Sequence, residues 1–132
     1  MKVLIPGGAG YIGAMLVPWL LADGHEITVY DTFLFGNAYF PDNPNLTVIK
    51  SDIRDNISFA RACGGQEAVI YLASISNDMV CRRNPQLAHE VNVEAFEPNL
   101  QAAKEIGVKK FIYASSVAVY GSSVPPTYQM AE

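Results

Sequence analysis

The sequence has few charged residues, few cysteines and no long apolar run, and each shortage excludes a class of protein. Charged residues make up 17% of the chain and the net charge is −4, which leaves no basic face for sequence-independent binding of nucleic acid. No apolar run approaches the length of a membrane span, and the sequence enters the first predicted strand directly, so we expect no leader peptide. Cys63 and Cys81 lack the spacing of metal ligands, so we expect no metal site and reduced thiols in a cytoplasm.

Half of the residues are hydrophobic, and short apolar runs alternate along the chain with helical segments. The pattern predicts strands over residues 2–5, 26–30, 46–50, 68–73 and 110–114, and helices over residues 11–22, 55–63 and 85–106. Residues 32–45 are predicted to form a long loop, because Pro41 and Pro44 interrupt regular structure. Strand and helix alternate up to residue 114, and a chain of 132 residues suits a single domain, so the pattern predicts one α/β domain with a doubly wound parallel sheet of strand order 3-2-1-4-5.

Two prolines and one polar segment do not follow this pattern. Pro18 and Pro98 fall inside predicted helices, where each removes a backbone donor and favours a kink. A polar segment follows the fourth predicted strand and is expected to be a loop on the ligand side of the sheet. Its polar residues either contact a substrate or simply face water; they are Asn77, Asp78, Arg82 and Arg83.

Four glycines within seven residues follow the first predicted strand and precede the first predicted helix. This context indicates a dinucleotide-binding turn, since glycine permits unusual backbone angles and a close approach to a pyrophosphate. The N-terminus of the helix then presents unpaired N–H groups to the phosphates. Two registers fit the glycines: one uses Gly8, Gly10 and Gly13, and the other uses Gly7, Gly10 and Gly13.

Asp31 ends the second predicted strand, about 20 residues after the glycines, where the dinucleotide motif places a carboxylate that binds the adenosine ribose. A carboxylate at this position repels a 2′-phosphate, so the sequence favours NAD over NADP. The alternative is that Asp31 only caps the strand or opens the following loop. In that loop, aromatic residues cover the adenosine end or pack against the rim of the sheet; they are Phe33, Phe35, Tyr39 and Phe40.

Beyond the glycines, the chain resembles the extended short-chain dehydrogenase/reductase family, in its NAD-dependent epimerase/dehydratase group. The resemblance covers nearly the whole chain and rests on six segments: residues 7–13, 30–31, 51–55, 71–74, 91–93 and 111–121. It selects the register Gly7, Gly10 and Gly13. Pro6 departs from the family pattern, because a threonine is usual at that position. The resemblance implies a Rossmann-type NAD-binding domain over residues 1–132, truncated before the remaining strands and the substrate domain.

The resemblance also implies roles for individual residues. Asp52 would accept a hydrogen bond from the exocyclic amine of adenine, and Ser116 would contact the substrate oxygen that gains or loses a proton. Two serines after a strand otherwise indicate a helix cap or a turn. The residues expected to bind NAD are Gly7, Gly10, Tyr11, Ile12, Gly13, Asp31, Asp52, Ile53, Leu72, Ala73, Ser74, Asn92 and Ser115.

The acid/base pair of the family, a tyrosine followed four positions later by a lysine, is expected about 25 residues after Ser116, beyond Glu132. Tyr128 does not replace it, because Glu132 stands where the lysine would be needed, and Tyr120 belongs to the preceding turn. We therefore expect a longer parent protein, a homodimer in this family, and little or no turnover by these 132 residues alone.

The leading interpretation is an NAD-dependent epimerase or dehydratase that acts on nucleotide sugars through transient hydride transfer. A reductase or dehydrogenase of the same family is an alternative. A second alternative is a non-catalytic module whose NAD occupancy controls a partner. A Tyr-x-x-x-Lys motif in the coding sequence after Glu132 would support the enzyme, and its absence, with NAD binding retained, would support the sensor.

Overall fold

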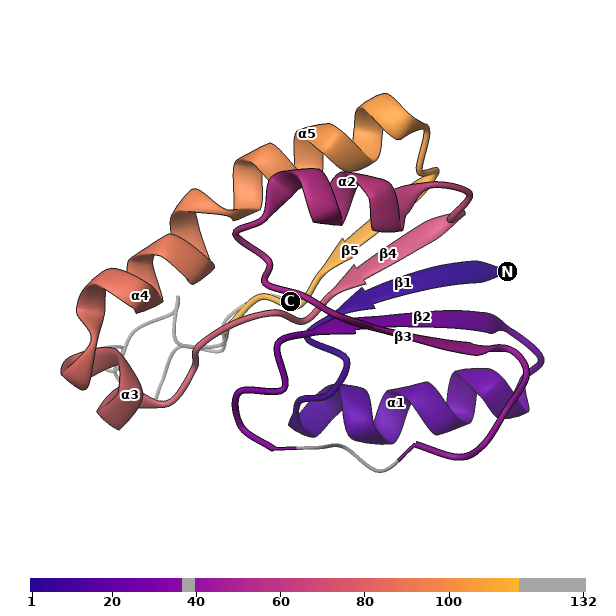
Figure 1. The fold of residues 1–132 in the computed structure, drawn as a ribbon, viewed down its shortest axis with the longest axis horizontal. Helices are drawn as coiled ribbons and strands as arrows, with labels where there is room; N and C mark the ends of the chain where they lie inside the picture. Colours follow the sequence, from indigo (N-terminus) through magenta and orange to yellow (C-terminus); the bar gives the residue numbers. More distant parts are fainter. Residues whose placement is uncertain (37–39, 117–132) are drawn as a thin grey trace, which may run out of the picture.

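The computed structural model describes residues 1–36 and 40–116, and these residues form a five-stranded parallel sheet (Figure 1). The strands are β1 (Lys2–Pro6), β2 (Glu26–Asp31), β3 (Leu46–Lys50), β4 (Ala68–Tyr71) and β5 (Lys110–Tyr113). Their order is β3-β2-β1-β4-β5, which confirms the predicted doubly wound sheet. Among the residues singled out above, Tyr39, Tyr120, Tyr128 and Glu132 lie outside the described ranges.

Helices cover both faces of the sheet. Helix α1 (Tyr11–Ala22) packs on one face, and α2 (Asn56–Cys63) and α5 (Phe96–Ile106) pack together on the other (Figure 1). Pro18 does not break α1, because Val17 and Leu21 bury the helix against the sheet and packing supplies most of a helix's stability. Asp55, predicted as the first residue of the second helix, is its N-cap and accepts a hydrogen bond from Ser58 N–H.

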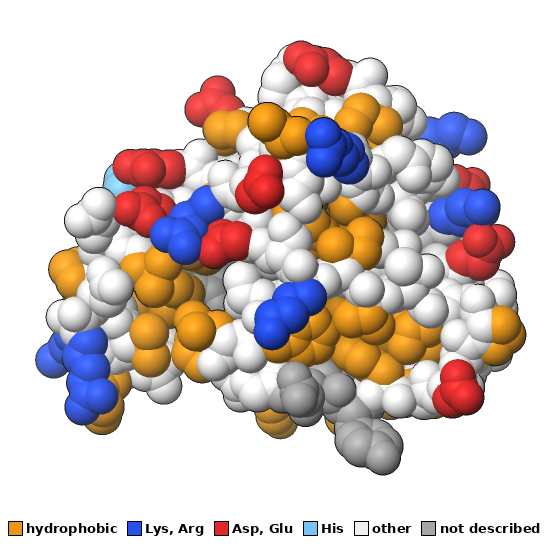
Figure 2. Space-filling model, in the orientation of Figure 1, with side chains coloured by type: hydrophobic (Ala, Val, Ile, Leu, Met, Phe, Trp, Pro, Cys, Tyr) orange, Lys and Arg blue, Asp and Glu red, His pale blue; other side chains and the backbone are white. Residues whose placement is uncertain are grey.

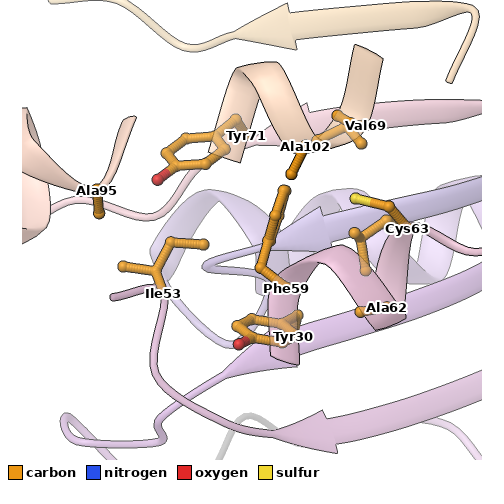
Figure 3. Packing of buried hydrophobic residues seen from close by; sticks show 11 residues of the cluster. Tyr30, Ile53, Phe59, Ala62, Cys63, Val69, Tyr71, Ala95 and Ala102 are labelled. Carbon is orange, nitrogen blue, oxygen red and sulfur yellow. The ribbon is translucent and has the colours of Figure 1, made fainter. Parts of the chain in front are cut away.

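Two hydrophobic clusters fill the space between the sheet and these helices. The cluster beneath α2 and α5 is built on aromatic rings: Phe59 stands between Tyr30 and Tyr71, with ring centroids 6.0 and 6.3 Å away (Figure 3). The cluster beneath α1 is aliphatic, and Phe33 and Phe40 of the loop after β2 pack against it. These two rings therefore take the packing role rather than remaining free to cover a ligand.

The prediction of a loop after β4 is wrong, because α3 (Asp78–Arg83) forms there. The Asn77 side chain caps this helix by accepting hydrogen bonds from the N–H groups of Met79 and Val80. The negative charge of Asp78 in the first turn and the positive charges of Arg82 and Arg83 in the last turn interact favourably with the helix dipole. The helix buries no residue, so it has no apolar periodicity that would reveal it in the sequence.

The prediction of one helix over residues 85–106 is also wrong. The segment divides into α4 (Pro85–His89), a π-helical turn η1 (Glu90–Glu94) and α5. In η1 the Ala95 N–H donates to the Glu90 carbonyl, five residues back. Pro98 has no N–H to bond the Glu94 carbonyl, which would be its acceptor in a continuous α-helix. The π-helical turn thus ends where the proline removes a bond.

The strand ends also differ slightly from the prediction. β1 and β2 each include one more residue, Pro6 and Asp31, whereas β4 and β5 end at Tyr71 and Tyr113. Just after β4, the backbone of Leu72 and Ala73 passes directly against Gly7. On β5, Ile112 and Tyr113 are exposed at the edge of the described sheet.

Candidate functional site

The turn between β1 and α1 is built on close backbone contacts that only glycine permits. Gly7 has a φ of 78°, and a Cβ there would lie 2.5 Å from the Ala73 nitrogen. A Cβ on Gly13 would collide with the backbone of Gly8, so the first turn of α1 packs directly on the turn that precedes it. The contact at Gly7 belongs to the register Gly7, Gly10 and Gly13, whereas the contact at Gly13 is common to both registers, and a Cβ on Gly8 would lie 2.9 Å from the Ile5 carbonyl oxygen.

The N-terminus of α1 lies open at the carboxyl edge of the sheet. Gly10 is its N-cap, and among the described residues no side chain caps this end. The first hydrogen bond into the helix runs from Ala14 N–H to the Gly10 carbonyl, so the N–H groups of Tyr11, Ile12 and Gly13 have no acceptor within the helix. Such a terminus suits an anion, because unpaired donors and the helix dipole point the same way. The side chains of Tyr11 and Ile12 are 94% and 58% exposed.

Asp31 connects the end of β2 to the glycine turn. Its Oδ2 accepts from Ala9 N–H at 3.0 Å, and its Oδ1 accepts from Phe33 N–H at 2.8 Å. The second bond opens the following loop, as the alternative interpretation expected; the first one fixes the carboxylate beside the turn. A carboxylate has about four acceptor positions, so two remain for hydroxyl groups of a ligand.

The segment after β4 borders the glycine turn on its other side. Leu72 and Ala73 meet Gly7, and Leu72 N–H donates to the Pro6 carbonyl at 2.8 Å. Asn92 of η1 holds the next residues: its amide accepts from Ile75 N–H at 2.8 Å and donates to the Ile75 carbonyl at 2.9 Å, and its oxygen lies 3.3 Å from Ser74 Oγ. The π-helical turn therefore positions the amide that anchors this segment.

The turn after β3 carries Asp52 in an ionic network. Arg54 Nε and Nη2 donate to the Asp52 carboxylate at 3.0 and 2.8 Å, and Arg54 Nη1 donates to Glu90 at 2.6 Å. Figure 2 shows acidic and basic side chains crowded together at the upper left, where α4 leads into α5. The hydrogen bonds from Arg54 lower the pKa of Asp52 and also that of Glu90, so both carboxylates stay ionised.

Sequence reasoning missed two residues that hold this turn. The buried hydroxyl of Tyr30 donates to the Asp52 carbonyl at 2.8 Å. The fully buried amide of Asn99 donates to the Ile53 carbonyl at 2.8 Å and accepts from Asn56 at 3.1 Å. A polar residue on the buried face of α5, in line with Ala95, Ala102 and Ala103, was the available signal for Asn99.

Ile53 itself is 6% exposed, so little of its surface remains for the predicted adenine contact. Beside it, a groove of about 630 Å³ opens between the turn after β3 and the start of α5. Asp52, Arg54 and Glu90 line this groove, and no residue of the glycine turn does. The groove therefore does not contain the glycine turn.

Ser115 and Ser116 follow β5 and are exposed at the same carboxyl edge of the sheet. β5 reaches this edge beside β4, where Ala114 N–H donates to the Tyr71 carbonyl at 3.2 Å. All the predicted binding residues therefore end a strand, follow the carboxyl end of one, or lie on η1 or the first turn of α1. Within residues 1–36 and 40–116, no helix is long and apolar enough to cross a membrane.

A parallel sheet in this order, with a glycine turn leading into a helix and an aspartate ending the second strand, defines a Rossmann-type dinucleotide-binding fold. Comparison with known sequences confirms the resemblance and makes it specific. The chain belongs to the NAD dependent epimerase/dehydratase family, whose sequence model matches residues 3–132. NAD, predicted from Asp31, is the cofactor of this family.

Similar proteins within this family have more than one activity. UDP-glucose 4-epimerase of Corynebacterium glutamicum is 33% identical over 133 residues, covering 98% of the chain and 40% of that protein. A 3-beta-hydroxysteroid dehydrogenase of Mycolicibacterium neoaurum is 33% identical over 122 residues, covering 89% of the chain and 32% of that protein. The chain thus spans about a third to two fifths of the length of these relatives.

The fold agrees with solved structures of the same family. UDP-glucose 4-epimerase of Thermus thermophilus, solved as a complex with NAD, superposes with a TM-score of 0.87. The two chains are 33% identical, and the match covers all of this chain and 43% of the other.

Proposed function

We propose that this chain binds NAD and supplies the cofactor half of an epimerase or dehydratase that acts on nucleotide sugars. The observation that carries the proposal is the glycine turn with Asp31 bonded to it, because together they match a pyrophosphate and an adenosine ribose. The similarity to UDP-glucose 4-epimerases supports the substrate class. Bound NAD would accept a hydride from a sugar carbon and return it.

The residues of the chain divide the work along the carboxyl edge of the sheet. The N–H groups that begin α1 would bind the pyrophosphate, and Gly7 and Gly13 let the backbone approach it closely. Asp31 would accept from the ribose hydroxyls, and Asn92 would act near the nicotinamide ribose. Ser116 would hydrogen-bond the substrate oxygen, with Ser115 beside the cofactor. Leu72, Ala73 and Ser74 would line the path of the dinucleotide beside the glycine turn, and Asp52 and Ile53 would contact adenine.

A titration with NAD and with NADP tests the cofactor site. Removing the carboxylate in Asp31→Ala should weaken NAD binding at least about tenfold, because a hydrogen bond to a charged group contributes about 1.5–3 kcal/mol. The same variant should narrow the gap between NAD and NADP, since the repulsion of a 2′-phosphate disappears. Asp23→Ala, an exposed aspartate at the other end of α1, is the matched control and should bind both as the wild type does. Unchanged affinity of Asp31→Ala for both cofactors contradicts the assignment.

A dehydrogenase or reductase is the second candidate, favoured by the similarity to a 3-beta-hydroxysteroid dehydrogenase. The two candidates differ in their second ligand. With NAD present, the full-length protein should bind UDP-glucose if it is a nucleotide-sugar enzyme, whereas it should bind a 3-hydroxysteroid if it is a steroid enzyme. We further propose that the full-length protein is a homodimer and that it is cytoplasmic. Cys63 and Cys81 are both free thiols, which suits a reducing compartment, and burial raises the pKa of Cys63 to about 11.

A further inference from the structure

Arg54 bridges two segments that are far apart in the sequence. Its guanidinium bonds the Asp52 carboxylate on one side and Glu90 of η1 on the other. Glu90 is itself held by Gln86 of α4, whose Nε2 donates to it at 2.9 Å. The turn after β3 is thereby connected through one arginine to the π-helical turn that carries Asn92.

The same bonds determine what the Asp52 carboxylate can still bind. Arg54 uses about three of its four acceptor positions: its backbone N–H and Nε both donate to Oδ1, and Nη2 donates to Oδ2. One acceptor position remains, on Oδ2. Because the carboxylate is ionised and its plane is fixed by the bidentate arginine, this position accepts a single donor from a fixed direction.

The position of Asp52 relative to Asp31 indicates which ligand group supplies that donor. β2 and β3 are neighbours, and Ser51 N–H donates to the Asp31 carbonyl at 3.0 Å, so the two carboxylates follow adjacent strand ends. Adjacent strands lie about 4.8 Å apart, which is the scale of the step from a ribose to its base. A pyrophosphate at the start of α1 would lie on the β1 side of Asp31, so a purine on a ribose held by Asp31 would extend to the other side, toward Asp52 after β3.

We propose that Arg54 is a positioning residue for purine specificity: it orients the Asp52 carboxylate so that its one remaining acceptor position selects a 6-amino purine over a 6-oxo purine. This inference rests on the proposed NAD function. An amine donates to the carboxylate, whereas a carbonyl at the same place presents a second acceptor and is repelled. Glu90 supports the role by holding the guanidinium from the side opposite Asp52.

A contribution to stability alone does not account for the network. The Arg54 and Asp52 side chains are 40% and 37% exposed, and pairs with this exposure contribute little to folding. Variants of Arg54 should therefore fold normally, which allows ligand selection to be measured apart from stability.

The test compares NAD with nicotinamide hypoxanthine dinucleotide, in which a carbonyl replaces the adenine amine, by calorimetric titration. The wild type should bind NAD about tenfold more tightly, the effect expected for a single exposed hydrogen bond to a charged group. Arg54→Gln should reduce this preference to within about threefold while its melting temperature stays that of the wild type. Arg61→Gln, an exposed arginine in the last turn of α2, is the matched control and should keep the full preference.

Each of the other possible results overturns a different part of the proposal. A folded Arg54→Gln variant with the full wild-type preference overturns the positioning role. A wild type that binds both dinucleotides equally overturns purine selection but leaves the NAD site in place. A wild type that binds neither dinucleotide overturns the proposed function and this inference together.

Discussion

The two sides of the candidate site are held in different ways. On the side of β1 and α1, the glycine turn depends on backbone contacts, with Gly7 against Ala73 and Gly13 against Gly8. On the side of β3 and α5, the turn of residues 51–56 depends on side chains from distant segments, among them Asn99. The first side therefore tolerates no added atom, whereas the second tolerates small changes but needs its hydrogen bonds.

This difference predicts how each side fails. Adding a methyl group to the glycine turn forces the backbone to move, which disturbs fold and ligand binding together. Removing a polar group from the other side leaves a buried donor or acceptor unpaired, which loosens that turn locally. Substitutions on the two sides should therefore differ in both size and extent.

The largest effect is expected from Gly13→Ala. The new Cβ meets the Gly8 backbone, which cannot give way, so we expect a loss of about 3 kcal/mol in the free energy of unfolding and the loss of NAD binding. Urea denaturation and NAD titration measure both. Gly24→Ala, just beyond the other end of α1, is the control: it has open space around it and should cost about 1 kcal/mol through its positive φ, with NAD affinity retained. A Gly13→Ala variant as stable as the wild type would contradict the claim that the glycine turn tolerates no added atom.

A smaller and more local effect is expected from Asn99→Leu. This change keeps the volume but leaves the Ile53 carbonyl and the Asn56 amide without their partner, at a cost of about 2 kcal/mol. Hydrogen exchange should rise in residues 51–56 and stay unchanged in residues 7–14. Gln101→Leu, an exposed position on the same helix, should change the stability by less than about 0.5 kcal/mol. Equal loosening of both segments would show that the two sides are not independent.

The smallest effect is expected from Tyr30→Phe, which removes only the hydroxyl that holds the Asp52 carbonyl. We expect a loss of about 1 kcal/mol in urea denaturation, since the ring still packs against Phe59. Tyr113→Phe, on a half-exposed ring of β5, serves as the control and should be close to neutral. A stability loss in Tyr30→Phe no larger than in Tyr113→Phe would mean that the hydroxyl does not hold this turn.

The same contrast explains which features of the fold and of the site could be predicted from the sequence. The sheet order was predictable, because apolar runs record local backbone needs, whereas the glycines alone left two registers open and the family resemblance chose between them. Helix α3 could not be predicted, because it buries no residue. The π-helical turn at residues 90–94 could not be predicted either, because it depends on a hydrogen bond that Pro98 lacks. The roles of Tyr30, Arg54 and Asn99 depend on partners 22 to 46 residues away, which no local pattern contains.

A crystal structure of the protein with NAD tests the central claim most directly. It should show the pyrophosphate at the N–H groups that begin α1 and a hydroxyl of the adenosine ribose within hydrogen-bonding distance of Asp31. NAD bound elsewhere, or an adenosine ribose that does not reach Asp31, would contradict the claim that the glycine turn and Asp31 together form the cofactor site.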